Sequence, residues 1–218
     1  GDGPGFLVNR LLFPYMNEAL ELLIEGASLK EIDRAATAFG MPMGPITLSD
    51  LVGLDTALYA GNVMQQAFPS RFVSSPLLSA MVKGGRLGQK SGRGFFSYQN
   101  KRGKAEDDPA METLLAEHRR DQRKFSRDAL TNRLFLPMLV EATRMLEEKI
   151  VRDVRDVDLG LIFGIGFPPF RGGLLFWADS LGAAKIVEML KPLEPLGERY
   201  QPTPLLLDMA AKGSKFYP

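Results

Sequence analysis

Two asparagines on apolar helix faces are the side chains of this sequence best suited to bind a ligand by hydrogen bonds. Asn9 falls on the same helical stripe as Phe13 and Met16, and Asn132 has the same setting in a second, similar segment. A buried amide without a partner costs about 1 to 3 kcal/mol, so each needs one. That partner is either a neighbouring turn, which makes the amide structural, or a ligand or catalytic group in a cleft. The residues alone favour the structural role.

The single histidine is poorly placed for acid–base catalysis or metal binding. His118 lies in the charged stretch from Glu117 to Lys124, which is typical of a solvated helix face. A catalytic base needs an orienting carboxylate, and a metal ligand needs companions. There is no cysteine, so thiolate metal sites and disulfides are excluded. We predict no metal site and expect any acid–base group to come from outside this chain.

Three cations lie on the glycine-rich stretch from Gly84 to Gly94. Glycine-rich turns signal a dinucleotide site only where a buried strand precedes them, and no such strand is predicted here. Arg86, Lys90 and Arg93 suit an anionic ligand held mainly by another domain, with Lys90 best placed. A solvated loop is the commoner explanation for such charges.

The stiff segment from Phe167 to Gly173 combines two prolines, two glycines and aromatic residues around one arginine. It fits two structures: the lining of a channel for an apolar ligand, or a rigid connector packed against Trp177. The charge balance and the composition also limit the classes of partner that we expect. Lys plus Arg number 27 and Asp plus Glu 26, so we expect no nucleic-acid partner. No apolar run is long enough to predict a transmembrane segment.

These side chains must be positioned by helices, and the helices come in two related sets. Asn9-Arg10-Leu11-Leu12-Phe13-Pro14 returns as Asn132-Arg133-Leu134-Phe135-Leu136-Pro137, 123 positions later (132 − 9), and matching segments follow in the same order. Apolar residues recur at helical spacing throughout, without sustained alternation. The sequence therefore predicts an all-α protein with a first domain at 1–98, a linker and connecting helix at 99–124, and a duplicated domain at 125–218.

Several motifs together resemble the C-terminal domain of 3-hydroxyacyl-CoA dehydrogenases over practically the whole chain. They are Gly3-Pro4-Gly5-Phe6 with Asn9-Arg10, the turn from Pro42 to Pro45 with Asp50, and the segment from Gly88 to Phe95. The duplication, with Gly166-Phe167-Pro168-Pro169-Phe170-Arg171-Gly172-Gly173, resembles the multifunctional α-subunits of fatty acid β-oxidation complexes. The resemblance implies two tandem helical bundles of the 6-phosphogluconate dehydrogenase C-terminal type, without a Rossmann domain.

What this resemblance implies for function is a part of an NAD-dependent enzyme that oxidises 3-hydroxyacyl-CoA to 3-ketoacyl-CoA. A preceding domain holds NAD and the catalytic histidine, and a hydratase domain lies further upstream. Asn9 matches the active-site asparagine that contacts substrate, and Lys90 matches a lysine near the cofactor. Phe163 occupies the place of a substrate-contacting tyrosine, from which only an apolar contact carries over. Asn132 is expected to be structural.

Two further expectations follow from the same resemblance. The chain alone is inactive, closes the substrate site, and works in the cytoplasm with acyl-CoA as substrate and a thiolase β-subunit or a second copy as possible partners. The alternative function is a non-catalytic helical scaffold that docks subunits, which the aromatic residues from Phe167 to Trp177 favour.

Overall fold

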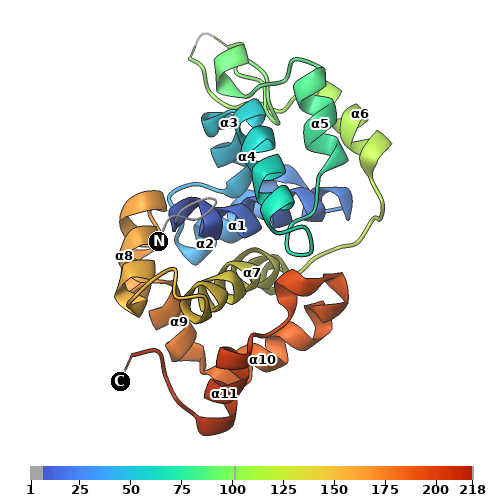
Figure 1. Ribbon diagram of the computed structural model, residues 1–218. Helices are drawn as coiled ribbons and strands as arrows, with labels where there is room; N and C mark the ends of the chain where they lie inside the picture. Colours follow the sequence, from blue (N-terminus) through green and yellow to red (C-terminus); the bar gives the residue numbers. More distant parts are fainter. Residues whose placement is uncertain (1–6, 101, 218) are drawn as a thin grey trace.

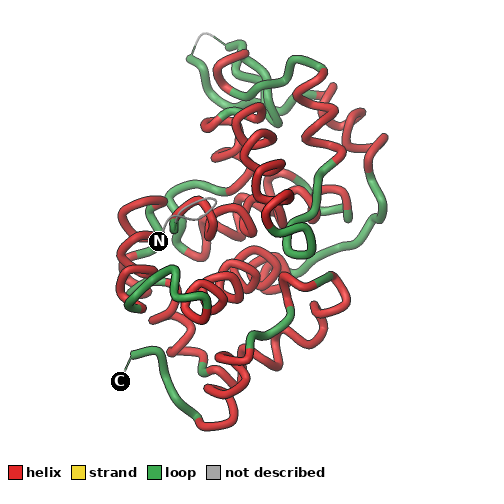
Figure 2. The backbone as a smooth tube through the Cα atoms, viewed as in Figure 1, coloured by secondary structure: helices red, strands yellow, loops and turns green. Residues whose placement is uncertain are grey.

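The computed structural model describes residues 7–100 and 102–217, which form helices and turns without a sheet (Figures 1 and 2). Extended pairing among these residues is confined to three isolated bridges between Gly88 and Glu106. The predicted all-α fold is confirmed. The motif from Gly3 to Phe6 lies outside the described residues. The α-helices are α1 (Val8–Ile24), α2 (Leu29–Phe39), α3 (Pro45–Val52), α4 (Leu54–Ala67), α5 (Pro76–Lys83), α6 (Pro109–His118), α7 (Arg127–Glu147), α8 (Val154–Ile165), α9 (Leu174–Leu181), α10 (Ala183–Leu190) and α11 (Pro204–Lys212).

Local signals explain where several helices begin. At the start of α2, the Glu31 amide donates to the Ser28 hydroxyl, and the Ser28 amide donates to the Glu31 carboxylate at 2.9 Å. This is a capping box, which satisfies two free N–H groups. Pro76 and Pro204 open α5 and α11, where a missing N–H costs nothing.

The longest helices, α1 and α7, pack against each other at the centre, and the remaining helices of each copy lie to either side (Figure 1). Each contains a proline, Pro14 or Pro137. The apolar core runs continuously through both copies. It includes Phe39 of the first copy stacked on Phe135 of the second, with ring centroids 3.9 Å apart. We refer to residues 7–98 as the first copy and 125–217 as the second.

Buried ion pairs join the two copies reciprocally. Arg10 in α1 donates to Glu141 in α7 at 2.7 Å, while Arg133 in α7 donates to Glu18 in α1 at 2.8 Å. Each side chain of these pairs is at most 4% exposed. Arg10 and Arg133 are counterparts in the repeat, and so are Glu18 and Glu141. The repeated motif therefore encodes the contact between its own two copies.

A second pair of carboxylates repeats this symmetry at the ends of the helices. Arg133 donates two hydrogen bonds to Glu25, at 2.9 and 3.0 Å, and Arg10 donates to Glu148 at 2.6 Å. Burial opposes ionisation of both carboxyls, yet these arginines hold the pKa of Glu25 and of Glu148 below its usual value. The interface is thus built from ionised groups that satisfy one another.

Each copy is closed by an aspartate that holds its C-terminal aromatic segment, and the aspartate is buried in the first copy and half-buried in the second. Asp50 accepts from the Phe95 and Phe96 amides at 2.8 and 3.0 Å, and Tyr98 donates its hydroxyl at 2.9 Å. In the second copy, Asp179 accepts from two backbone amides of its own closing segment, at 2.8 and 2.9 Å. These ties explain why the repeat continues past its helices.

We expect Tyr98→Phe to lower the free energy of unfolding by about 1.5 to 3 kcal/mol at neutral pH, because a donor to a buried carboxylate is lost. Burial raises the pKa of Asp50, and its hydrogen-bond donors oppose this rise. Since the hydroxyl stabilises the ionised form, the deficit should shrink as pH falls through the folded pKa of Asp50. Urea denaturation over a pH series measures this. Tyr59→Phe, at a side chain that is 73% exposed, is the control and should change little.

The connection between the copies differs from the prediction, although the domain boundaries themselves stay a prediction. The connecting helix expected within residues 99–124 ends at His118, and the backbone after it bonds to the end of α1. Arg120 and Arg123 donate amide hydrogen bonds to carbonyls there. Asp108, expected in a polar linker, is buried against Arg86. Tertiary hydrogen bonds outweigh helix propensity in this segment.

Candidate functional site

Asn9 lies on an exposed surface in the first turn of α1. The expectation that it occupies a buried stripe is wrong. The apolar stripe of α1 is covered over only part of its length. Helix α4 packs on α1 at Phe13, where a Cβ at Gly61 would lie 3.3 Å from the Phe13 ring. Asn9 therefore needs no protein partner and its amide faces outward. Asn132 is half-buried and lines a separate depression beside Phe125.

The second copy contributes the neighbouring surface through α8. This helix contacts the start of α1, where Gly160 and Gly164 face Leu7 and Val8. In Figure 1, α8 lies beside the first turn of α1. Phe163 on α8 is 83% exposed. The structure thus brings the helices of Asn9 and Phe163 into contact, although the two residues are far apart in the sequence.

Below Asn9 on α1, a small apolar cavity of about 40 Å³ lies between α1 and α4. Its lining includes Phe13, Leu20 and Leu58. Asn17 also lines it, and its buried amide nitrogen has no hydrogen-bond partner. Sequence analysis missed Asn17. A signal was available, because its counterpart in the second copy is the fully buried Val140.

Lys90 lies apart from Asn9, at the other end of α4. Its ammonium is 2.5 Å from the Asp55 carboxylate and lowers the pKa of that carboxyl. Gly53, which Lys90 contacts, precedes Gly61 by eight residues, roughly 12 Å along a helix. Arg86, which was grouped with Lys90 as a candidate for an anionic ligand, instead donates to the Gly94 carbonyl at 2.6 Å and is buried.

Between Lys90 and Asn9, α4 presents a largely uncovered face. Only Leu54 and Met64 of this helix are buried. Tyr59 is 73% exposed and Val63 is 39% exposed, and Leu51 at the end of α3 is 52% exposed. Apolar side chains grouped in this way are typical of a contact surface. The candidate site is this face of α4 together with Asn9 and Phe163.

The described residues supply neither a metal site nor a dinucleotide cradle. They contain no group of three His, Cys, Asp or Glu residues arranged to hold a metal ion. A dinucleotide fold needs a parallel strand that leads into a glycine-rich turn, and residues 7–100 and 102–217 contain no strand. These residues therefore do not form the main binding domain for NAD. No helix in the described part of the chain has the length and apolar character needed to cross a membrane.

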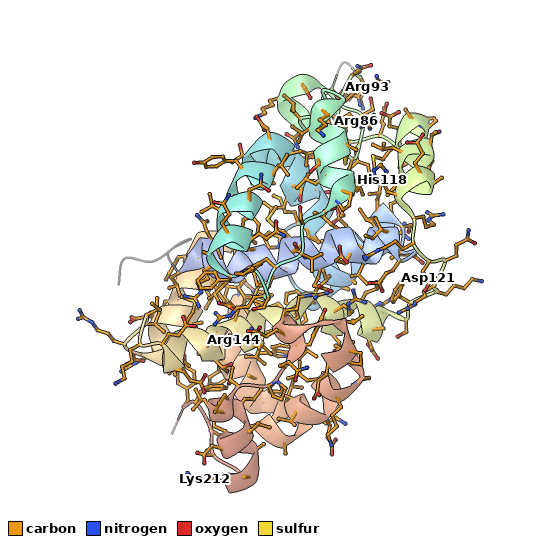
Figure 3. All side chains as sticks on the ribbon, turned by 45° about the vertical axis from the view of Figure 1, so that its right-hand side comes forward. Arg86, Arg93, His118, Asp121, Arg144 and Lys212 are labelled. Atoms are coloured by element: carbon orange, nitrogen blue, oxygen red, sulfur yellow. The ribbon has the colours of Figure 1, made fainter. Side chains whose placement is uncertain are left out.

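The side chains labelled in Figure 3 are spread over the molecule and do not form a catalytic cluster. His118 is half-buried, and its Nδ1 lies 3.0 Å from the Leu114 carbonyl of its own helix. It lies near the ion pair of the exposed Arg120 with the buried Glu21. Burial raises the pKa of Glu21 despite that arginine. These contacts give the histidine a structural role at the end of α6.

Comparison with known proteins identifies one family. The family model described as "3-hydroxyacyl-CoA dehydrogenase, C-terminal domain" matches residues 5–98 and 130–215. The chain is 42% identical over 221 residues to the fatty acid oxidation complex subunit alpha of Pseudomonas savastanoi pv. phaseolicola and to that of Pseudomonas aeruginosa strain LESB58. Each alignment covers 99% of this chain and 31% of the relative, so the chain spans about a third of these relatives.

Two solved structures share the fold. The 3-hydroxybutyryl-CoA dehydrogenase from Escherichia coli K12 superposes with a TM-score of 0.77 at 23% identity, over 96% of this chain and 60% of that one. The dehydrogenase part of multifunctional enzyme 1 from C. elegans superposes with a TM-score of 0.70 at 23% identity, over 95% of this chain and 48% of that one. Both similarities extend over the two copies.

Proposed function

The chain belongs to the family of 3-hydroxyacyl-CoA dehydrogenase C-terminal domains, and on this basis we propose that it closes the substrate site of an NAD-dependent dehydrogenase of fatty acid oxidation. The substrate is a 3-hydroxyacyl-CoA and the product the corresponding 3-ketoacyl-CoA. In this proposal a nucleotide-binding domain of the same polypeptide holds NAD, and a hydratase domain lies further upstream. The enzyme is cytoplasmic.

The observation that carries this proposal is that Asn9 and Phe163 are both exposed and lie on two helices, α1 and α8, that contact each other. Neither side chain has a role in the core. Asn9 can donate to an oxygen at the reacting carbon of the substrate, and Phe163 can contact its apolar part. Such positioning accelerates a reaction that another group carries out.

The uncovered face of α4 is the surface on which the nucleotide-binding domain docks in this proposal. Tyr59 and Val63 are the apolar contacts, and Lys90, which pairs with Asp55 at the start of this helix, is the cation for the anionic cofactor. NAD supplies the hydride acceptor when that domain binds it. The residues of this chain orient the substrate and keep water from the reacting atoms.

The isolated chain is expected to be inactive. With acetoacetyl-CoA and NADH, the absorbance of NADH should stay constant, because the described residues offer no dinucleotide cradle. Addition of the separately produced nucleotide-binding domain should start turnover. Turnover by the chain alone would contradict the proposal, as would the lack of any turnover by the longer polypeptide that contains both parts.

A scaffold that docks subunits is the second candidate, and specific exposed residues favour it. Phe170 is 76% exposed and Phe176 is 51% exposed, both near α9. A thiolase subunit or a second copy of the chain is the expected partner on that surface. Light scattering of the chain, with and without thiolase, tests this. A monomer that does not bind thiolase leaves the dehydrogenase role as the function of this chain.

A further inference from the structure

The two copies differ where the second helix of each copy packs against the long helix of the other copy, that is, where α2 contacts α7 and α8 contacts α1. Asp33 in α2 and Asp158 in α8 are equivalent, 125 positions apart (158 − 33), because each accepts from the first-turn amides of the next helix. In this register, Phe39 of the first copy corresponds to Gly164 of the second. A large ring in one copy is thus absent from the other.

This difference changes the surroundings of the two asparagines. Near Asn132, the buried Phe39 ring stacks on Phe135, three residues away on α7. Near Asn9, the corresponding Gly164 is exposed and has only hydrogen in place of the ring. The helix face beside Asn9 therefore lacks a ring from α8, whereas α2 places its Phe39 ring on α7 three residues along from Asn132.

Contact between α8 and α1 is close at the same place. A Cβ on Gly164 would lie 2.9 Å from both methyl groups of Val8, and one on Gly160 would lie 2.6 Å from a methyl group of Leu7. Real Cβ atoms almost never approach so closely, so Gly164→Ala must move the Val8 side chain, whereas the flexible end of Leu7 can move away from a Cβ on Gly160. The first turn of α1 has no side-chain cap and no acidic residue to hold it. Packing against α8 and the buried ion pair of Arg10 with Glu141 restrain it.

We propose that Gly164 is a positioning residue for the dehydrogenase reaction: it sets the first turn of α1, and so the Asn9 amide, while leaving space beside that amide for substrate. The inference rests on the proposed function and deepens it. The second copy then forms part of the site, through Gly164 and Phe163, in addition to supporting the first copy from behind.

Steady-state kinetics of the longer polypeptide with Gly164→Ala is the main test. A shift of the amide by about 1 Å is expected to lower kcat roughly 100-fold, with KM changed much less. The second substitution Val8→Ala removes the methyl groups that the new Cβ meets, and should restore much of kcat. Gly84→Ala is the control, because its Cβ would contact only carbonyl oxygens of α5, at 3.3 and 3.5 Å.

A readout independent of activity uses this chain itself. The NMR resonances of the Asn9 side-chain amide should move in Gly164→Ala, return toward their original positions with Val8→Ala, and stay unchanged in Gly84→Ala. Unmoved resonances in Gly164→Ala, or a kcat within about threefold of the parent, would overturn the inference. An inactive parent polypeptide would instead refute the proposed function, and the NMR result would still decide whether Gly164 positions Asn9.

Discussion

Replacing Glu18 by alanine is expected to lower the free energy of unfolding by about 3 to 5 kcal/mol, because it leaves buried cations without their counter-charge. Glu18 is completely buried and accepts from Arg133 at 2.8 Å, from the Tyr200 hydroxyl at 2.6 Å, and from Arg199. For a chain of this size the loss corresponds to a fall of roughly 6 to 20 °C in melting temperature. Calorimetry and urea denaturation both measure it.

The matched control is an ion pair at the surface. Arg155→Ala removes the partner of Asp153, and the two side chains are 73% and 36% exposed. An exposed pair contributes about 0 to 1 kcal/mol, so this variant should unfold almost as the parent does. If Glu18→Ala and Arg155→Ala had equal effects, the reciprocal pairs would not be what joins the two copies.

Asn9→Ala is expected to lower kcat of the longer polypeptide about 100- to 1,000-fold, which is the usual effect of losing one positioned hydrogen-bond donor at a reacting oxygen. Because Asn9 is exposed, the melting temperature should barely change. The substitution therefore separates catalysis from folding. Initial rates with a 3-hydroxyacyl-CoA and NAD, together with a melting curve, give both quantities.

Asn132→Ala is the internal control, since the repeat places this residue at the equivalent position of the second copy. It is half-buried on α7 and lines a depression beside Phe125, apart from the surface that carries Asn9. We expect kcat to stay near that of the parent. Equal losses of kcat in Asn9→Ala and Asn132→Ala would show that the amides support the fold, and that neither contacts substrate.

Helix positions were largely predictable because their signals are local. The capping box at Ser28, the prolines at the start of α5 and α11, and the repeat itself are all readable from neighbouring residues. The turns of 3-10 helix from Lys191 to Tyr200 were missed, because contacts with α10 and α7 hold their backbone and no periodic pattern marks them.

The partners of buried charges were not predictable in the same way. Arg10 and Glu18 lie on one helix, eight residues or roughly 12 Å apart, so they cannot pair with each other. Nothing in the spacing indicates that each finds its partner in the other copy. The exposure of Asn9 was missed for a related reason. A helical wheel shows which residues share a face, but not how far along that face a neighbouring helix extends.

The reciprocal contact between α1 and α7 is of the kind that joins identical subunits across a two-fold axis, yet here both partners belong to one polypeptide. Their association needs no encounter between molecules, so the stability of the pair is insensitive to dilution. Because the two copies are separate parts of one chain, their sequences can also differ. A homodimer carries every substitution twice, whereas this chain has Asn17 opposite Val140 and Gly164 opposite Phe39, and so one half can specialise while the other keeps its shape.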